Sequence, residues 1–474
     1  MIHITISIAI LLITGLAYLQ DILEMSFLML ELSILNIVVY CIRDLRNRMV
    51  LLFFIISFFV LLVSRVVISR YFDVSEFIYQ TEDEMFPRLF LEIYTQLIVA
   101  MNCAFLAYFI ITRKNRFEEC QYDFNSKPSR AIRNASRNLA YVCFVFLLYA
   151  LYRRISGVLV GGYGALYMDT EDLDIPFIVS FFANKFEMCM CLFLSTMPSK
   201  KEAKIPLIMF ALSAVLSLFT GQRNGFVIPI LFLVLYMYIR NDVPVKEKRK
   251  WISGRFLFAG LMLTPFLFVL MYLVMVIRGG KSSESGDIIN LFLGSVYQLG
   301  SSVQVIHDTI FFHDELAKQD YYSLEPIIDF LVHNPFTDWI FQVPHYEPFS
   351  VDMALHGRSL GYSITYITQP ERYFMGGSMG TSYIAEAWID FGYIGIVIYS
   401  CIYGVVLGKV VPFCKKNILF SFLSLYSMMQ IIYAPRFMAT TFVSRFLEVK
   451  SWPFFLIIIM VYLAAKNNRK KKTL

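Results

Sequence analysis

The sequence predicts an all-α polytopic integral membrane protein with about twelve transmembrane helices and one large outer loop. The 474-residue chain is 58% hydrophobic and only 16% charged, whereas soluble domains are about 25% charged. Apolar stretches recur from end to end, and most approach the ~20 residues that a helix needs to cross ~30 Å of hydrocarbon. Because backbone polar groups cannot stay unpaired in lipid, we expect these stretches to be helices.

The expected spans are closely spaced, except for one long interval between the ninth and the tenth. In chain order they are 2–19, 25–42, 49–69, 89–112, 139–160, 176–197, 205–220, 225–238, 256–277, 382–407, 418–433 and 453–465. The seventh and eighth are short and could form one interrupted hairpin. The first has no basic region before it and no small-residue cleavage site, so we expect a retained helix rather than a signal peptide.

Basic residues orient these spans, because Lys and Arg concentrate in every second connection. The basic segments are 43–48, 113–137, 200–204, 240–255, 409–416 and 466–472. By the positive-inside rule they lie in the cytoplasm, together with both termini. The net charge of +6 then comes from these connections, which form a basic cytoplasmic face against anionic membrane lipid. We expect no nucleic-acid partner, because no basic and aromatic module lies outside the spans.

The interval 278–381 is the large outer (periplasmic or extracellular) loop of this topology, and it divides the chain into 1–277, 278–381 and 382–474. Apolar residues recur at helical spacing in it, as at Ile288, Leu291 and Phe292. We therefore expect a folded cap of short helices on the outer leaflet. None of the 8 cysteines falls in an outer loop, which disfavours a disulfide framework or a zinc site. The sequence implies no metal and no cofactor.

Charged residues within the spans are informative, because they are costly in lipid and usually face a bundle interior. They are Glu31, Arg65, Glu92, Arg153, Arg154, Lys185 and Glu187. One interpretation is ion pairing between helices: Glu187 with Arg153 or Arg154, and Arg65 or Lys185 with Glu31 or Glu92. The other is that Arg65 and Lys185 bind substrate.

Four arginines are exceptions to the concentration of basic residues on the cytoplasmic side, because they lie at the outer ends of spans: Arg223, Arg278, Arg436 and Arg445. Arg223 lies in a Gly-Gln-Arg-Asn-Gly turn beside Gln222. Snorkelling at the interface is one explanation. The other is anion binding, because guanidinium binds phosphate oxygens bidentately and stays charged. A lipid-linked phosphate or pyrophosphate would suit that position.

A glycine- and hydroxyl-rich segment, 376–395, leads into the tenth span. Ser378, Thr381 and Ser382 offer hydroxyls at a helix start, which can cap the helix or hold an anion. Glu386 follows one turn later and is a candidate general base. Gly392 and Gly395 would allow close helix packing. All but one of the 6 histidines lie in the outer loop and are also candidate bases: His307, His313, His333, His345 and His356.

Together these features resemble the Wzy-type O-antigen and capsular polysaccharide polymerases. Three stretches carry the resemblance: 221–225 between two short helices, 278–280 opening the large loop, and 377–386 leading to the Gly-x-x-Gly of 392–395. The resemblance covers most of the chain as topology and a small part of it as motif. It implies a GT-C-like polymerase/ligase architecture.

The resemblance also implies an inverting, metal-independent glycosyltransferase. Such polymerases join undecaprenyl-pyrophosphate-linked oligosaccharide repeat units on the outer face of the bacterial inner (plasma) membrane, alongside a flippase and a chain-length regulator. In this interpretation Arg223 and Arg278 match arginines that clamp the donor pyrophosphate. Glu386 and the loop histidines remain candidates for the base.

Other functions stay open at this point. An O-antigen ligase-like transferase is similar, but ligases usually place a His just before the Gly-x-x-Gly helix, where this sequence has Thr381 or its neighbours. A lipid-linked oligosaccharide flippase or other transporter explains the spans but not the large loop. A non-catalytic scaffold would not need the outer arginines. The sequence does not specify the sugars, the linkage or the final polysaccharide.

Overall fold

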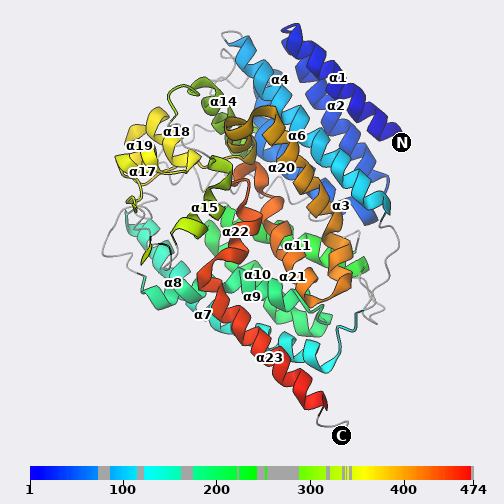
Figure 1. Cartoon of the computed structure of the whole chain (residues 1–474), viewed down its shortest axis with the longest axis vertical. Helices are drawn as coiled ribbons and strands as arrows, with labels where there is room; N and C mark the ends of the chain where they lie inside the picture. The colour runs from blue at the N-terminus through cyan, green and yellow to red at the C-terminus, as the bar shows by residue number, and fades with distance from the viewer. Residues whose placement is uncertain are drawn as a thin grey trace. The chain divides into compact units, whose positions relative to one another are not determined.

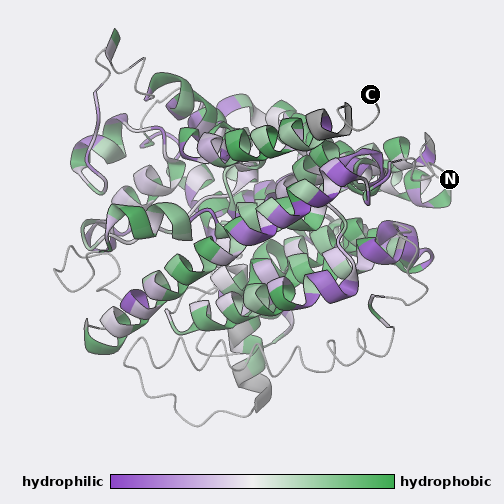
Figure 2. Ribbon diagram, turned by 90° about the horizontal axis from the view of Figure 1, so that it is seen from below, coloured by the Kyte–Doolittle hydropathy of each residue, from purple (hydrophilic) through white to green (hydrophobic). Residues whose placement is uncertain are grey.

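The computed structural model is helical throughout the part of the chain that it describes (Figure 1). The described residues are 1–72, 86–114, 122–161, 175–220, 224–242, 251–253, 288–316, 321–333, 337, 339–340 and 344–470. Eight helices among them are long and apolar enough to cross a membrane. Figure 2 shows apolar residues predominating along the long helices.

These eight helices correspond to predicted spans one to six, ten and twelve. They occupy Ile2–Leu19, Leu23–Ile42, Leu45–Tyr71, Pro87–Arg113, Lys127–Val160, Phe177–Ser195, Tyr383–Lys416 and Val449–Lys466. The predicted seventh, eighth and eleventh spans are also helical, but shorter or less apolar. The ninth, 256–277, lies outside the described residues. The polytopic helical fold is therefore confirmed, whereas the number twelve stays a prediction.

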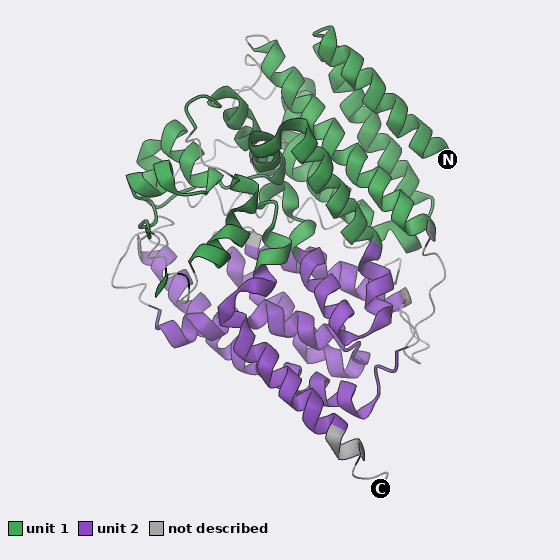
Figure 3. Cartoon of the chain, viewed as in Figure 1, with its two compact units in different colours: residues 1–114, 284–408, 430–444 green, residues 115–283, 409–429, 445–474 purple. Residues whose placement is uncertain are grey.

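The helices form two compact units, shown in different colours in Figure 3. Unit 1 comprises Met1–Lys114, Glu284–Gly408 and Gln430–Ser444. Its long helices are α1 (Ile2–Leu19), α2 (Leu23–Ile42), α3 (Leu45–Phe58) continuing through the π-helical η1 (Phe59–Val63) into α4 (Ser64–Tyr71), α6 (Pro87–Lys114), and most of α20 (Tyr383–Lys416). Helices α1, α2 and α6 pack against one another.

The described parts of the predicted outer loop also belong to unit 1 and form short helices, as their apolar spacing predicts. They are α13 (Ile288–Leu299), η5 (Gly300–Ser302), α14 (Val303–Phe311), η6 (Tyr322–Leu324), α15 (Glu325–Val332), α17 (Val351–His356), α18 (Leu360–Thr368) and α19 (Pro370–Phe374). Helix α13 packs on α4, and α14 packs on α6 and α18. The next segment, η5, also contacts α4, and Gly300 permits this approach because a Cβ there would lie 2.8 Å from the backbone nitrogen of Arg65. The segment η7 (Ala434–Arg436) completes this unit with the start of α22 (Thr441–Leu447).

Unit 2 comprises Asn115–Ser283, Lys409–Met429 and Arg445–Leu474. Its described helices are α7 (Lys127–Gly161), α8 (Phe177–Ala183), α9 (Phe186–Ser195), α10 (Lys200–Leu218), α11 (Asn224–Asp242), most of α21 (Ile418–Ile431), η8 (Val449–Ser451) and α23 (Trp452–Lys470). Helix α7 packs on α8, α9, α10 and α23. The predicted sixth span is interrupted between α8 and α9, where Asn184 and Lys185 leave the helix.

Helix α20 is broken at Gly392, whose φ of 60° and ψ of −149° are accessible almost only to glycine. A Cβ on Gly392 would meet nothing within 4 Å, and a Cβ on Gly395 would lie 2.2 Å from the carbonyl oxygen of Ala387 in the same helix. The expectation of close helix packing is therefore wrong for Gly392, which forms the kink. Gly395 allows a close approach between the two helical segments that meet at the kink, and Gly404 allows one to Ala104 of α6.

Candidate functional site

Three of the predicted site residues, Gln222, Arg223 and Arg278, lie outside the described residues. The proposed pyrophosphate clamp therefore stays a prediction, and the site is built below from the other candidates.

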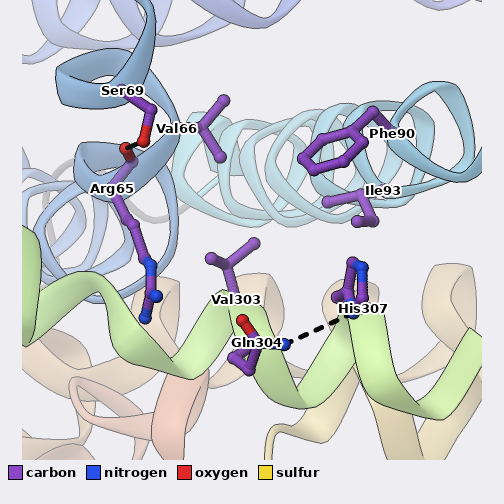
Figure 4. A pocket seen from close by; sticks show the side chains of 8 residues that line it. All are labelled: Arg65, Val66, Ser69, Phe90, Ile93, Val303, Gln304 and His307. Carbon is purple, nitrogen blue, oxygen red and sulfur yellow. Dashed lines mark hydrogen bonds between the residues drawn. The ribbon is translucent and has the colours of Figure 1, made fainter. Parts of the chain in front are cut away.

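Arg65 lies on α4, directly after the π-helical segment, and its guanidinium carbon lies 4.6 Å from the centre of the Tyr297 ring of α13. Figure 4 shows it at a small pocket between α4, α6 and α14, where Gln304 lies 3.4 Å from the Nδ1 of His307. The cavity measures about 20 Å³, which suffices for one water molecule. In this structure Arg65 therefore borders a space too small for a phosphate or a sugar.

The carboxylates expected to pair with Arg65 bind tyrosines instead. Glu31 accepts a hydrogen bond from Tyr71 at 2.9 Å. Glu92 accepts from Tyr18 at 2.7 Å and from Tyr393 at 3.1 Å. The predicted pairing of Arg65 with these residues is thus wrong.

Glu386 is fully buried in the first segment of α20. Its Oε1 accepts a hydrogen bond from the Thr381 hydroxyl at 2.7 Å, and its Oε2 accepts from the backbone N–H of Ala439 at 2.8 Å. Ser382 is fully buried beside it, and its hydroxyl lies 3.4 Å from the backbone nitrogen of Ile384. Both carboxyl oxygens of Glu386 are therefore occupied, which favours an anchoring role over proton transfer with a substrate.

The same helix segment also binds η6, which directly precedes α15. Asp390 accepts hydrogen bonds from the backbone N–H groups of Tyr322 and Ser323, at 2.9 and 2.7 Å. The Thr440 hydroxyl donates to the Ser323 carbonyl at 3.0 Å, and the Tyr403 hydroxyl donates to the Ala439 carbonyl at 2.7 Å. Residues 322–323 and 439–440 are thereby bound both to α20 and to each other.

Arg436 lies in η7, three residues before the Ala439 amide that Glu386 binds. It is half-buried, and its guanidinium forms no ion pair with any residue that the structure describes. Ser378 donates a hydrogen bond to the Gly361 carbonyl at 3.3 Å and accepts one from the Gly380 N–H at 3.1 Å. Among the candidates described in unit 1, the Arg436 guanidinium could thus bind an anion. The Ser378 hydroxyl instead makes hydrogen bonds to the backbone of Gly361 and Gly380.

The two remaining candidates belong to unit 2 and are ion-paired. Lys185, which is 4% exposed, pairs with Glu448. Arg445 lies 3.2 Å from the Oε2 of Glu187. The expected pairing of Glu187 with Arg153 or Arg154 is therefore wrong, because residue 445 supplies the partner.

The loop histidines separate into different environments. His307 lies 2.8 Å from the Asp308 carboxylate, and the exposed His313 lies 3.1 Å from Asp314. His333, His345 and His356 instead line one cavity of about 240 Å³. No group of three or more potential ligands suited to a metal ion occurs among the described residues.

Sequence reasoning missed three charged residues of this cavity, Glu325, Asp329 and Arg358. All three lie in the predicted loop, where a charged residue is ordinarily solvated surface. The only signal for Glu325 was its place at the start of an apolar helix, two residues before Ile327. That spacing indicates a helix but not which side chains meet across the loop.

The family comparison agrees with this architecture. The family model described as O-antigen polysaccharide polymerase Wzy matches residues 1–468. No curated protein and no solved structure matches the chain. Because the family match covers nearly the whole chain, and because several helices are suited to crossing a membrane, this multi-pass membrane protein belongs to the O-antigen polysaccharide polymerase Wzy family.

Proposed function

We propose that this protein is a polymerase that joins oligosaccharide repeat units carried on undecaprenyl pyrophosphate, at the outer face of the bacterial inner membrane. The family match over residues 1–468 carries the proposal. The basic connections support the orientation, because by the positive-inside rule they favour an outer position for the large loop. The product would be O-antigen, capsule or another exopolysaccharide, made with a flippase and a chain-length regulator as partners.

In the proposed reaction, a sugar hydroxyl of the incoming lipid-linked unit attacks the anomeric carbon of the growing glycan. The bond between that carbon and the pyrophosphate breaks, the configuration inverts, and the lipid pyrophosphate leaves with the electron pair. Positive side chains stabilise the charge that develops on the leaving group, so the step needs no metal.

We propose Arg223 and Arg278 as the clamp on that pyrophosphate, with Gln222 donating beside them. Arg436 is a further proposed substrate contact, because its guanidinium forms no ion pair with any described residue and Glu386 binds the backbone of its loop at Ala439. Arg65, Lys185, Ser378, Thr381, Ser382 and Arg445 remain proposed substrate contacts. Substrate would have to compete with the ion pairs of Lys185 and Arg445 and with the hydrogen bonds of Ser378 and Thr381.

The test uses a strain that lacks the gene and carries it on a plasmid. Wild-type protein should restore long polymer, whereas Arg223→Ala should leave single repeat units on lipid at the outer face. Lys201→Ala is the matched control, because Lys201 is exposed in a predicted cytoplasmic segment. Long polymer from Arg223→Ala at wild-type protein levels would refute the clamp. Single units that stay at the inner face in the deletion strain would instead indicate a flippase.

A further inference from the structure

A second site is formed by the short helices of the predicted outer loop in unit 1. The cavity of about 240 Å³ is bordered by α15, α17, the turn after α17, and residues 345–346. Its ionisable lining residues are Glu325, Asp329, His333, His345, Tyr346, His356 and Arg358. Small-ligand pockets start at about 300 Å³, so this one suits a single sugar unit better than a whole oligosaccharide.

Glu325 is the exceptional group in this cavity. Its Oε2 is buried and has no hydrogen-bond partner among the described residues, and the Nε of Arg358 is in the same state. Buried polar atoms almost always have partners, so such an atom in a cavity wall needs an explanation. A ligand hydroxyl that donates to Glu325 would supply the missing bond.

The other lining groups match the polar surface of a sugar. The rings of His333 and His345 lie 4.5 Å apart, and those of Tyr346 and His356 lie 5.9 Å apart. Flat rings and a mixture of donors and acceptors can contact both the carbon face and the hydroxyls of a pyranose. Arg358 adds a fixed positive charge, which would also suit an acidic sugar.

We propose that this cavity binds the terminal sugar of the acceptor repeat unit, and that Glu325 removes the proton from the hydroxyl that attacks. This inference rests on the proposed function above. As the acceptor oxygen forms its bond to the anomeric carbon, its proton passes to a carboxylate oxygen of Glu325. The lipid pyrophosphate leaves with the electrons of the broken bond. Release of the proton to solvent through the exposed side of the cavity then restores the carboxylate.

The electrostatic surroundings prepare Glu325 for this role. Burial, and then the Asp329 carboxylate, raise its pKa to about 8, while the Arg358 guanidinium opposes them. A base works best when its pKa lies near the working pH. The titratable or charged groups facing Glu325 come from its own helix and from its neighbours: Asp329, His333, His345, Tyr346, His356, Arg358, Tyr322, Tyr362 and Glu386.

The decisive measurement is the rate of polymerisation by the purified full-length protein in lipid nanodiscs, with lipid-linked repeat units, between pH 6 and 9. Wild-type activity should rise with pH and level off above about 8. Glu325→Gln should lower the turnover rate at least ~100-fold, in the range that positioned acid–base groups contribute. Glu315→Gln, an exposed carboxylate of the same loop, should behave as wild type.

Two further variants separate proton transfer from folding. Asp329→Asn removes a charge that raises the pKa of Glu325, so the inflection should move to lower pH. Arg358→Gln removes a charge that lowers it, so the inflection should move to higher pH. Opposite shifts support the assignment. Unchanged inflections in both variants, or a wild-type rate from Glu325→Gln, would overturn it.

The two proposals fail in different ways. If the wild-type protein forms no polymer from lipid-linked units, the proposed function is wrong. If the wild-type protein polymerises and Arg223→Ala does not, while Glu325→Gln remains active, only the role of Glu325 is wrong.

Discussion

Replacing Glu386 distinguishes a buried anchor from a proton-transfer group. Its carboxylate accepts from the Thr381 hydroxyl at 2.7 Å and from the Ala439 N–H at 2.8 Å. Leaving a buried donor unpaired costs about 1–3 kcal/mol. Glu386→Ala orphans two donors, so we expect a loss of about 2–6 kcal/mol in the free energy of unfolding.

Glu386→Gln should cost far less. The amide oxygen can still accept from the Ala439 N–H, and the amide nitrogen can donate to the Thr381 hydroxyl, which accepts as well as donates. We therefore expect Gln to preserve most of the stability and most of the polymerisation. Thr381→Ser should also preserve both, whereas Thr381→Val should lose about 1–3 kcal/mol through the unpaired Oε1 of Glu386.

The assay combines thermal unfolding in detergent with the rate of polymer formation at equal protein levels. If Glu386 is a structural anchor, stability and activity should both fall in Glu386→Ala and should both be largely kept in Glu386→Gln. A Gln variant as stable as wild type but inactive would refute this reasoning and make Glu386 a base after all.

Three further predictions concern backbone strain, buried charge and pH. Gly392→Ala should lower the free energy of unfolding by about 1–3 kcal/mol, because φ of 60° and ψ of −149° are strained for alanine. Gly15→Ala should cause no such loss, because a Cβ there would have no atom within 4 Å. Equal shifts of the two melting temperatures would argue against a strained kink. Glu448→Gln should lower the free energy of unfolding by about 1–3 kcal/mol, because the buried Lys185 ammonium loses a partner that is itself 46% exposed. The double variant with Lys185→Met should recover that loss, and failure to recover it would contradict the pairing. The raised pKa of Glu325 means that the folded state holds a proton that the unfolded state releases, so its contribution to the free energy of unfolding is complete below about pH 4.5 and is lost as the pH rises through about 8. Glu325→Gln should therefore make the denaturation midpoint less dependent on pH between these values. An unchanged pH dependence of the midpoint would count against a buried carboxyl.

Hydropathy predicted most of the helices, because crossing a membrane imposes a length and a composition that can be read locally. Helix α1 begins and ends where the sequence predicts, at Ile2 and Leu19. The break at Gly392 was not predicted, because a glycine in an apolar run is equally compatible with close packing and with a kink. The number of spans depends in part on 256–277, which lies outside the described residues.

The candidate site was predicted less well, because it depends on contacts between distant segments. The sequence identified Lys185 and Glu187 as charges that need partners, but the partners, Glu448 and Arg445, lie far along the chain. Composition drew attention to the loop histidines without showing which of them meet. For Glu325 the sequence indicated only the start of a helix, because the burial of its carboxyl oxygen depends on the fold.

The broken helix α20 sets the register between the two halves of the proposed chemistry. Asp390 binds η6, which leads into α15 and Glu325, and Glu386 binds Ala439, three residues after Arg436. One residue inserted between Asp390 and Glu386 would turn these attachment points about 100° out of phase and shift them ~1.5 Å along the axis. The length of that single helical turn therefore sets the distance between the attachment points of the proposed base, Glu325, and the proposed cation, Arg436. This distance does not depend on the thickness of the surrounding bilayer.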